Sequence, residues 1–328
     1  MNETDPTSSE SSPSKEQWTE TMADAPEFNG GNKPEEHEEL HEQEVIADAD
    51  VDFAEALTKT LPQVGEDGKV NYYICGSVAM DLLPRVRRLE SFYQKGADGE
   101  PESQGTIELP DSARTEFLKG VRKKGHDIDI AHVKKRIANT VLAQKVLERC
   151  KNPESIQLLS EEKFESRIFA FDTVSESQMQ SDFYYSRATL DDGEVIYIPS
   201  PGALIGAKAY EVAKMRLTRP MRANSGWIQL YHLDTPEKIE EFNQELAEKH
   251  KKGVEKRHKD LVTMLAGFAK VMPREQIIEA AKAAIMHRLE SDDRYFRKNK
   301  GGTPLEEGIR QIEEILNECL QTIPEETE

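Results

Sequence analysis

The sequence has few cysteines and no long apolar run. Its three cysteines, Cys75, Cys150 and Cys319, lie far apart in 328 residues and form no CxxC pair, which excludes a disulfide scaffold and a zinc-ribbon framework. No apolar stretch approaches the roughly 18 residues needed to span a bilayer, and the acidic N-terminus lacks the basic and apolar regions of a signal peptide. We therefore expect a cytoplasmic protein with no membrane partner.

Basic residues are scarce at the start of the chain. The first 50 positions hold 15 acidic and 2 basic side chains, a large share of the total net charge of −19. This segment also has little aliphatic content, so it cannot bury enough apolar surface to offset chain entropy. We predict that residues 1–50 are a disordered acidic tail, which is either simply solvated or docks onto a basic partner.

Alternating strand and helix patterns follow, and then helices alone. Strands are predicted over 70–75, 125–130, 167–174 and 194–198, with a loop over 95–111. Helices are predicted near 51–61, 78–83, 134–150 and 204–215, from Pro236, from Pro273 to Leu289 and from Pro304 to Leu320, with a possible break at Gly253. This order predicts an α/β (α+β) domain over 51–200 and a helical domain over 201–328.

Two aspartates carry the most chemical information. Asp127 and Asp129 lie two residues apart in the sequence Asp-Ile-Asp-Ile, so on a strand both fall on one face while the isoleucines face the core. Neighbouring carboxylates repel each other unless a cation lies between them, and oxygen ligands suit Mg²⁺ or Mn²⁺. The pair is therefore either a metal site or an exposed strand face.

A Gly-Ser turn lies about fifty residues before this pair. Gly76 and Ser77 separate the strand that ends at Cys75 from the next predicted helix. Backbone amides at such a turn, together with the Ser77 hydroxyl, can bind a phosphate, and glycine allows close approach. An ordinary strand-to-helix turn has the same sequence, so the motif gains meaning only together with the aspartates.

Taken together, these motifs resemble the polymerase-β superfamily of nucleotidyltransferases, and most closely its AbiEii-like abortive-infection toxin branch. The resemblance covers about residues 68–266. The matching segments are Ile74-Cys-Gly-Ser-Val-Ala-Met-Asp-Leu-Leu83, Gly125-His-Asp-Ile-Asp-Ile130, Ile198-Pro-Ser-Pro-Gly-Ala-Leu-Ile-Gly-Ala-Lys208, Arg216 and Lys259-Asp260-Leu261. The resemblance implies a nucleotidyltransferase-type mixed sheet flanked by helices, and a helical C-terminal domain.

The resemblance also implies roles for individual residues. Asp127 and Asp129 would hold Mg²⁺ or Mn²⁺ against the phosphates of an NTP, and Gly76 and Ser77 would bind its phosphate tail. A third carboxylate on a neighbouring strand would complete the metal site and help to activate the attacking hydroxyl. Asp172 is the candidate for this carboxylate, with Asp182 as the alternative.

Three residues of the helical part also enter the comparison. Lys208 occupies the position at which this branch carries a lysine on the helix behind the site, where it would reach the triphosphate. Lys259 and Asp260 resemble a later Lys-Asp pair that supports the site. The usual second acid of that pair is absent, and both residues are equally well explained as part of a solvated helix face.

Basic residues flank the proposed metal strand. They are Arg114, Lys119, Arg122, Lys123, Lys124, Lys134, Lys135 and Arg136. They would steer a nucleotide or an RNA acceptor toward the site, or they are solvated helix faces. His126 and His132 flank the strand without the spacing of metal ligands, so we interpret them as polar neighbours of the site.

Two classes of function follow. The first is a metal-dependent nucleotidyltransferase that moves an NMP from an NTP to a hydroxyl of RNA, protein or a small molecule. Such an enzyme could be the toxin of a toxin-antitoxin system, with an antitoxin as partner. The second is a catalytically inert nucleotidyltransferase-like module that binds nucleotides or partner proteins. The position of Asp172 relative to the aspartate pair separates the two.

Overall fold

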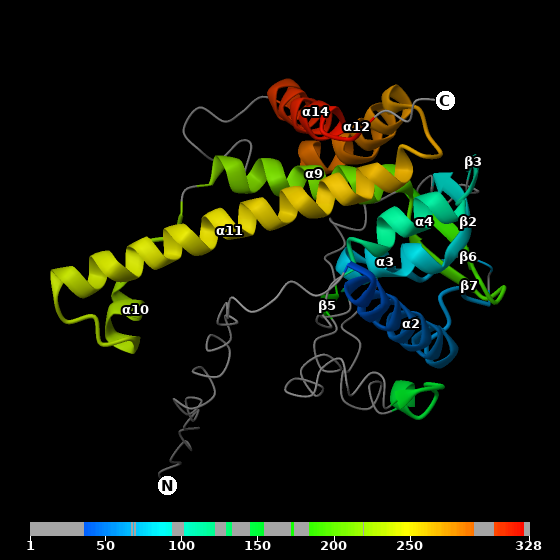
Figure 1. The fold of residues 1–328 in the computed structure, drawn as a ribbon, viewed down its shortest axis with the longest axis horizontal. Coiled ribbons are helices and arrows are strands. Elements are labelled where there is room, and N and C mark those ends of the chain that lie inside the picture. The colour runs from blue at the N-terminus through cyan, green and yellow to red at the C-terminus, as the bar shows by residue number, and fades with distance from the viewer. Residues whose placement is uncertain are drawn as a thin grey trace, which may run out of the picture.

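The computed structural model contains two β-sheets surrounded by helices (Figure 1). It describes residues 36–66, 68, 70–93, 102–121, 129–132, 145–153, 172–173, 184–218, 220–291 and 305–324. Within these ranges the protein is a mixed helix and sheet structure, as expected from the order of sequence patterns. None of the described helices is both long enough and apolar enough to cross a membrane.

The first helix begins within the segment predicted to be disordered. Helix α2 (Glu36–Thr60) has 25 residues and starts well before residue 51. Its apolar face is buried from Ile46 to Leu57 and includes Phe53, which is fully buried. Average composition concealed this face, because its small apolar residues stand among many acids. The boundary of the predicted tail was therefore wrong for residues 36–50, and residues 1–35 lie outside the described ranges.

A three-stranded sheet carries the motifs singled out in the sequence. Its order is β1 (Tyr72–Cys75), β4 (Asp129–His132) and β5 (Asp172–Thr173). β1 and β4 are antiparallel, whereas β4 and β5 are parallel. All four residues of β1 are buried, as expected of a β-branched and aromatic strand inside a core.

The second sheet is antiparallel, with the order β3-β2-β6-β7. Its strands are β2 (Val86–Tyr93), β3 (Glu102–Glu108), β6 (Tyr184–Leu190) and β7 (Val195–Pro199). The predicted loop over 95–111 was wrong for β3. This strand has the sequence Glu-Ser-Gln-Gly-Thr-Ile-Glu and lies at the edge of the sheet, where polar residues and glycine are tolerated because one side needs no partner strand.

The two sheets are joined by the side chain of Gln63. Its amide donates to the carbonyl oxygen of Tyr197 in β7 at 2.9 Å and accepts from the N–H of Tyr197 at 2.8 Å. The same Nε2 lies 3.5 Å from the carbonyl oxygen of Tyr72 in β1. A buried amide thus takes the place of a peptide group between β1 and β7.

Shorter helices connect the strands. α3 (Gly76–Leu82) follows β1 and passes into a 3₁₀ turn, η1 (Leu83–Arg85), and α4 (Asp111–Leu118) follows β3. The C-terminal part contains α9 (Pro201–Leu217), α10 (Ser225–Leu230), α11 (Pro236–Phe268), α12 (Arg274–Ser291) and α14 (Leu305–Gln321). Thr235 caps α11 by accepting from the N–H of Lys238, as predicted. Gly253 does not interrupt this helix.

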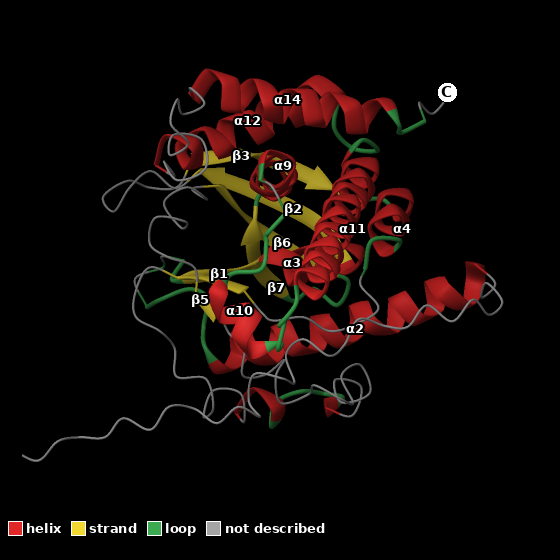
Figure 2. Ribbon diagram, turned by 90° about the vertical axis from the view of Figure 1, so that its left-hand side faces the viewer, coloured by secondary structure: helices red, strands yellow, loops and turns green. Residues whose placement is uncertain are grey.

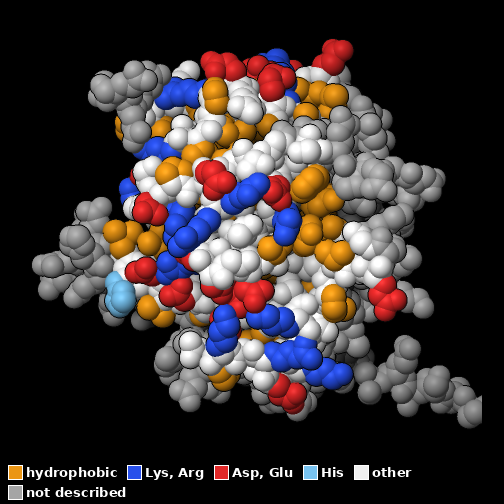
Figure 3. Space-filling view, turned by 90° about the vertical axis from the view of Figure 1, so that its right-hand side faces the viewer, with side chains coloured by type: hydrophobic (Ala, Val, Ile, Leu, Met, Phe, Trp, Pro, Cys, Tyr) orange, Lys and Arg blue, Asp and Glu red, His pale blue; other side chains and the backbone are white. Residues whose placement is uncertain are grey.

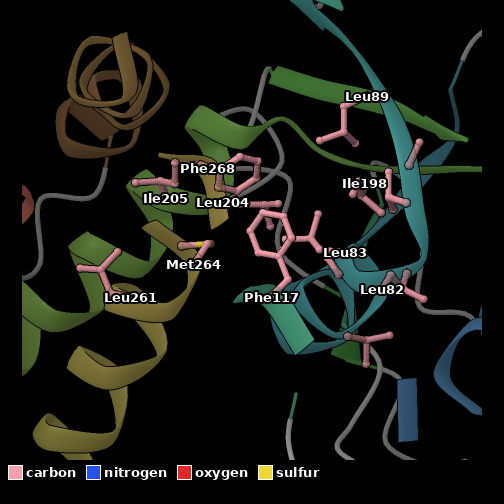
Figure 4. Packing of buried hydrophobic residues seen from close by; sticks show 14 of the residues in the cluster. Leu82, Leu83, Leu89, Phe117, Ile198, Leu204, Ile205, Leu261, Met264 and Phe268 are labelled. Carbon is pink, nitrogen blue, oxygen red and sulfur yellow. The ribbon is translucent and has the colours of Figure 1, made fainter. Parts of the chain in front are cut away.

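One apolar core connects the helices with the sheets. Phe117 of α4 lies edge-on to Phe268 of α11, with ring centroids 4.9 Å apart. Figure 4 shows these rings between Leu204 of α9 and Leu83. The predicted domains 51–200 and 201–328 therefore contribute to the same core.

Candidate functional site

The three strands of the first sheet bring the predicted residues to one edge. Cys75, the last residue of β1, pairs with Asp129, the first residue of β4. Asp129 in turn pairs with Asp172, the first residue of β5. We call this row of Cys75, Asp129 and Asp172 the aspartate edge. Residues in register on adjacent strands share a face of the sheet, so Asp129 and Asp172 occupy neighbouring positions on one face.

Gly76 begins the turn that follows Cys75 at this edge. Its φ is +65°, whereas Cys75 is extended with φ −127°. Left-handed backbone costs an L-residue about 1–2 kcal/mol, a cost that glycine avoids. Gly76 is exposed and Ser77 is half-buried at the start of α3. The Cys75 side chain does not cap this helix, so the first amides of α3 open directly onto the aspartate edge.

Two of the predicted carboxylates lie outside the described residues. Asp127 falls in 122–128 and the alternative third carboxylate, Asp182, in 174–183. Among the described residues, no group of three or more His, Cys, Asp or Glu side chains could hold a metal ion. The donor set at the edge is made of oxygen ligands, which suit Mg²⁺ or Mn²⁺; the edge itself contributes Asp129 and Asp172.

Helix α2 anchors the connection between β4 and β5. Both carboxylate oxygens of the buried Asp52 accept backbone N–H groups, one from Lys151 and one from Asn152, each at 2.8 Å. The neighbouring carboxylate of Glu55 lies 2.7 Å from the Lys151 ammonium. Residues 145–153 belong to the crossover between the two parallel strands, so these bonds hold the chain that links Asp129 to Asp172. Sequence reasoning missed both acids, although they border the apolar face of α2.

Glu55 and Asp192 respond to this environment in opposite directions. Burial raises the pKa of Glu55 above its ordinary value, more than the Lys151 ammonium lowers it. Asp192 lies in the turn between β6 and β7. Its slight burial is outweighed by a hydrogen bond from the N–H of Glu194 and by Glu55 and Lys151, so the pKa of Asp192 is lowered.

Lys208 is nearly buried in α9, with 7% of its surface exposed. Its ammonium lies 3.2 Å from the Glu211 carboxylate, and the Arg257 guanidinium of α11 approaches the same oxygen at 3.6 Å. In Figures 1 and 2, α9 and α11 both lie above β5. Lys208 thus belongs to a cluster of two cations and one carboxylate between these helices, and its role toward a triphosphate stays a prediction.

Lys259 and Asp260 lie farther along α11. Lys259 is exposed, and Asp260 lines a small hollow with Met80, Leu83 and Phe117. Met80 and Leu83 mark the end of α3, whereas Gly76 marks its start. The pair is therefore next to the end of α3 that is distant from the aspartate edge.

Many basic side chains near the second sheet are paired with acids. Arg114, predicted to attract a polyanion, lies 2.9 Å from Asp191 and 3.1 Å from Asp111, and Lys119 lies 3.1 Å from Glu116. Figure 3 shows acidic and basic side chains intermingled on this face. The other members of the predicted basic cluster, Arg122, Lys123, Lys124, Lys134, Lys135 and Arg136, lie outside the described residues, as does His126; His132 ends β4.

Two of the three thiols are unsuited to nucleophilic chemistry. Burial raises the pKa of Cys150 to about 12, with the Asp52 charge adding to the effect, and burial raises the pKa of Cys319 to about 11. Both groups are therefore protonated near neutral pH, and a thiolate is the reactive form of cysteine.

Comparison of the chain with family models, with curated proteins and with solved structures gives no match. The functional assignment therefore depends on the residues and on their arrangement.

Proposed function

We propose that the protein is a metal-dependent nucleotidyltransferase that transfers an NMP from an NTP to an acceptor hydroxyl. The observation that carries the proposal is the register of the aspartate edge. Cys75, Asp129 and Asp172 are distant in sequence, yet they pair in one row across three strands. This places the Gly76-Ser77 turn next to two of the three predicted carboxylates.

The proposed reaction needs a phosphate site beside a carboxylate site. Gly76 and Ser77 would hold the phosphate tail through backbone amides and the hydroxyl. Asp127, Asp129 and Asp172 would hold the divalent cation, which when bound neutralises phosphate charge and acts as a Lewis acid. We assign Asp172 a second role as the base that takes the proton of the acceptor hydroxyl.

The bond changes are those of an in-line displacement. The acceptor oxygen forms a bond to the α-phosphorus, the bond between that phosphorus and the bridging oxygen breaks, and pyrophosphate leaves with the electron pair. The register supports an active enzyme over the inert nucleotide-binding module, because a strand neighbouring Asp129 supplies a further carboxylate at the same position.

The experiment uses the full chain with Mg²⁺ and each α-labelled NTP, alone and with total RNA, with protein label and small-molecule label scored separately. We expect wild type to transfer label, Asp129→Asn to abolish transfer, and Asp172→Asn to slow it by about 10²- to 10⁴-fold. Asp234→Asn serves as the matched control, because Asp234 is exposed in the turn before α11.

Each other result has a definite meaning. Transfer at the wild-type rate by Asp129→Asn would show that the chemistry occurs elsewhere. NTP binding without transfer to any acceptor would favour the inert module. Transfer to RNA or protein would make a toxin role, with an antitoxin partner, the next hypothesis to test.

A further inference from the structure

Helix α11 carries a concentrated block of positive charge in a protein of net charge −19. From Lys249 to Lys259 the sequence is Lys-His-Lys-Lys-Gly-Val-Glu-Lys-Arg-His-Lys, with six Lys or Arg residues and one acid. The preceding stretch of the same helix, 237–248, contains five glutamates and one lysine. The positive charge is thus limited to the middle of the helix.

The structure divides this block into an inner side and an outer side. The inner residues contact neighbouring helices: Arg257 Nε lies 3.6 Å from Glu211 of α9, His250 Nε2 lies 3.1 Å from the carbonyl oxygen of Met215, and His258 Nε2 lies 3.4 Å from Cys319 Sγ of α14. These three side chains are therefore occupied in holding α11 against the body of the protein.

Four lysines remain on the outer side. Lys249, Lys252, Lys256 and Lys259 are all exposed and follow one another at spacings of three, four and three residues, which places them on one face of the helix. We call this set the lysine face. It spans about 15 Å at 1.5 Å per residue, a length over which one strand of a duplex presents about four phosphates.

The face continues toward the sheet domain. Thr263 follows Lys259 by four residues and packs on Gly120 at the end of α4, where an added Cβ would lie 2.9 Å from Thr263 Cγ2. Acids border the lysine face without interrupting it: Glu248 lies 3.7 Å from Lys252, and Glu245, Glu255 and Asp260 stand nearby in the sequence of the helix. The lysines form a continuous row between them.

We propose that the lysine face binds the phosphate backbone of a nucleic acid. A regular row of ammonium groups matches a regular row of phosphates, whereas an acidic protein surface has no such fixed spacing. This binding is independent of nucleotide transfer. It also differs from the paired arginines near the second sheet, whose charges are satisfied by acids within the chain.

The test measures binding of a fluorescein-labelled 20-nucleotide RNA and of a 20-base-pair DNA by anisotropy, in EDTA and without NTP, from 50 to 200 mM KCl. The test variant changes all four lysines of the face to Gln. The control variant changes Lys145, Lys238, Lys251 and Lys282 to Gln, which gives the same net charge. A third variant replaces the four face lysines by Arg.

We expect wild type, the control and the Arg variant to bind one or both probes with affinities within about twofold of each other. The Gln variant should lose at least about tenfold in affinity at 100 mM KCl, and its salt dependence should be shallower by about 0.7 to 0.9 per lost phosphate contact. A preference between the two probes identifies RNA or DNA as the partner.

Several results would overturn the proposal: no binding of either probe by wild type at 50 mM KCl, equal losses in the control, or displacement of the probe by poly-glutamate at equal charge concentration. Circular dichroism of each variant reports whether α11 is intact. If the Gln variant loses helicity, the Arg variant decides, because lysines that serve only ion pairs within the helix would leave no binding in any variant. Since the assay contains no NTP or metal, its failure leaves the proposed transferase activity untouched.

Discussion

The aspartate edge and the interface between α9 and α12 are held together by opposite means. At the edge, strands of four, four and two residues meet, and the connection behind them is fixed by polar bonds from Asp52 and Glu55. At the interface, Gly202 and Gly206 of α9 lie against Ala280 and Ala281 of α12, with no room for another atom. The contrast teaches that the helical body provides the stability and that the site depends on a few polar anchors.

The largest effect is expected in the shared core. Phe268 is fully buried and contacts Phe117, so Phe268→Ala should lower the free energy of unfolding by about 3–5 kcal/mol through lost burial and a cavity. Denaturant unfolding followed by far-UV circular dichroism measures this loss. Because sheets and helices share the core, both should unfold in one transition; a separate transition of the helical part would contradict the shared core.

The second effect concerns the close approach of α9 and α12. A Cβ on Gly202 would lie 2.5 Å from the carbonyl oxygen of Ala280, so Gly202→Ala should force the helices apart and cost about 1–3 kcal/mol. Thermal unfolding monitors the change. An unchanged midpoint would mean that the helices do not approach this closely.

The third effect is local to the edge. Asp52→Ala removes the acceptor of two backbone N–H groups, at a cost of about 1–3 kcal/mol. We expect faster hydrogen exchange in residues 145–153 than in α9, together with reduced nucleotide transfer. Exchange that rises equally in both regions would show that Asp52 supports the whole fold.

The fourth effect is a pH dependence carried by Glu55. Because its pKa is raised in the folded state, the unfolded chain binds fewer protons between the ordinary pKa of about 4.5 and the raised value, so this contribution to stability falls as pH increases through that window. The lowered pKa of Asp192 acts at lower pH, where its contribution is lost on acidification.

Urea unfolding of wild type and of Glu55→Gln between pH 4 and 7 separates the two acids. We expect a flatter profile for Glu55→Gln in this range. Asp111→Asn, at a highly exposed position, is the control and should keep the wild-type profile. An identical profile for Glu55→Gln would assign the pH dependence to other groups.

The smallest effect is a gain. Gly253 lies within α11 near the flexible end of Met215, so Gly253→Ala should stabilise the helix by up to about 1 kcal/mol. The thermal midpoint should rise slightly, in contrast to the fall expected for Gly202→Ala. A lower midpoint would show that Met215 cannot move aside.

Sequence patterns predicted the parts of the fold that depend on local signals. The buried strand ending at Cys75 and the cap at Thr235 were confirmed, because apolar strands and capped helices are encoded by adjacent residues. β3 and the start of α2 were missed. An edge strand tolerates polar residues, and a helix with an acid-rich exposed side conceals its apolar face within the average composition.

The candidate site was predicted only as a set of residues. Spacing indicated that Asp127 and Asp129 share a face, but the row from Cys75 through Asp129 to Asp172 is set by strand pairing between distant segments. Asp52 and Glu55 gave no separate signal, because their role depends on a backbone segment almost a hundred residues away. The roles of the site residues remain predictions.

The aspartate edge also has a consequence for the order of folding. Its three members come from segments separated by more than forty residues each, so forming the row requires two long loops to close, and loop closure carries an entropic cost that local helices do not bear. We expect α2, α9 and α11 to gain structure before the row is complete. A chain still leaving the ribosome would thus hold a folded scaffold with an unassembled site, and activity would appear only once β5 has joined its neighbours.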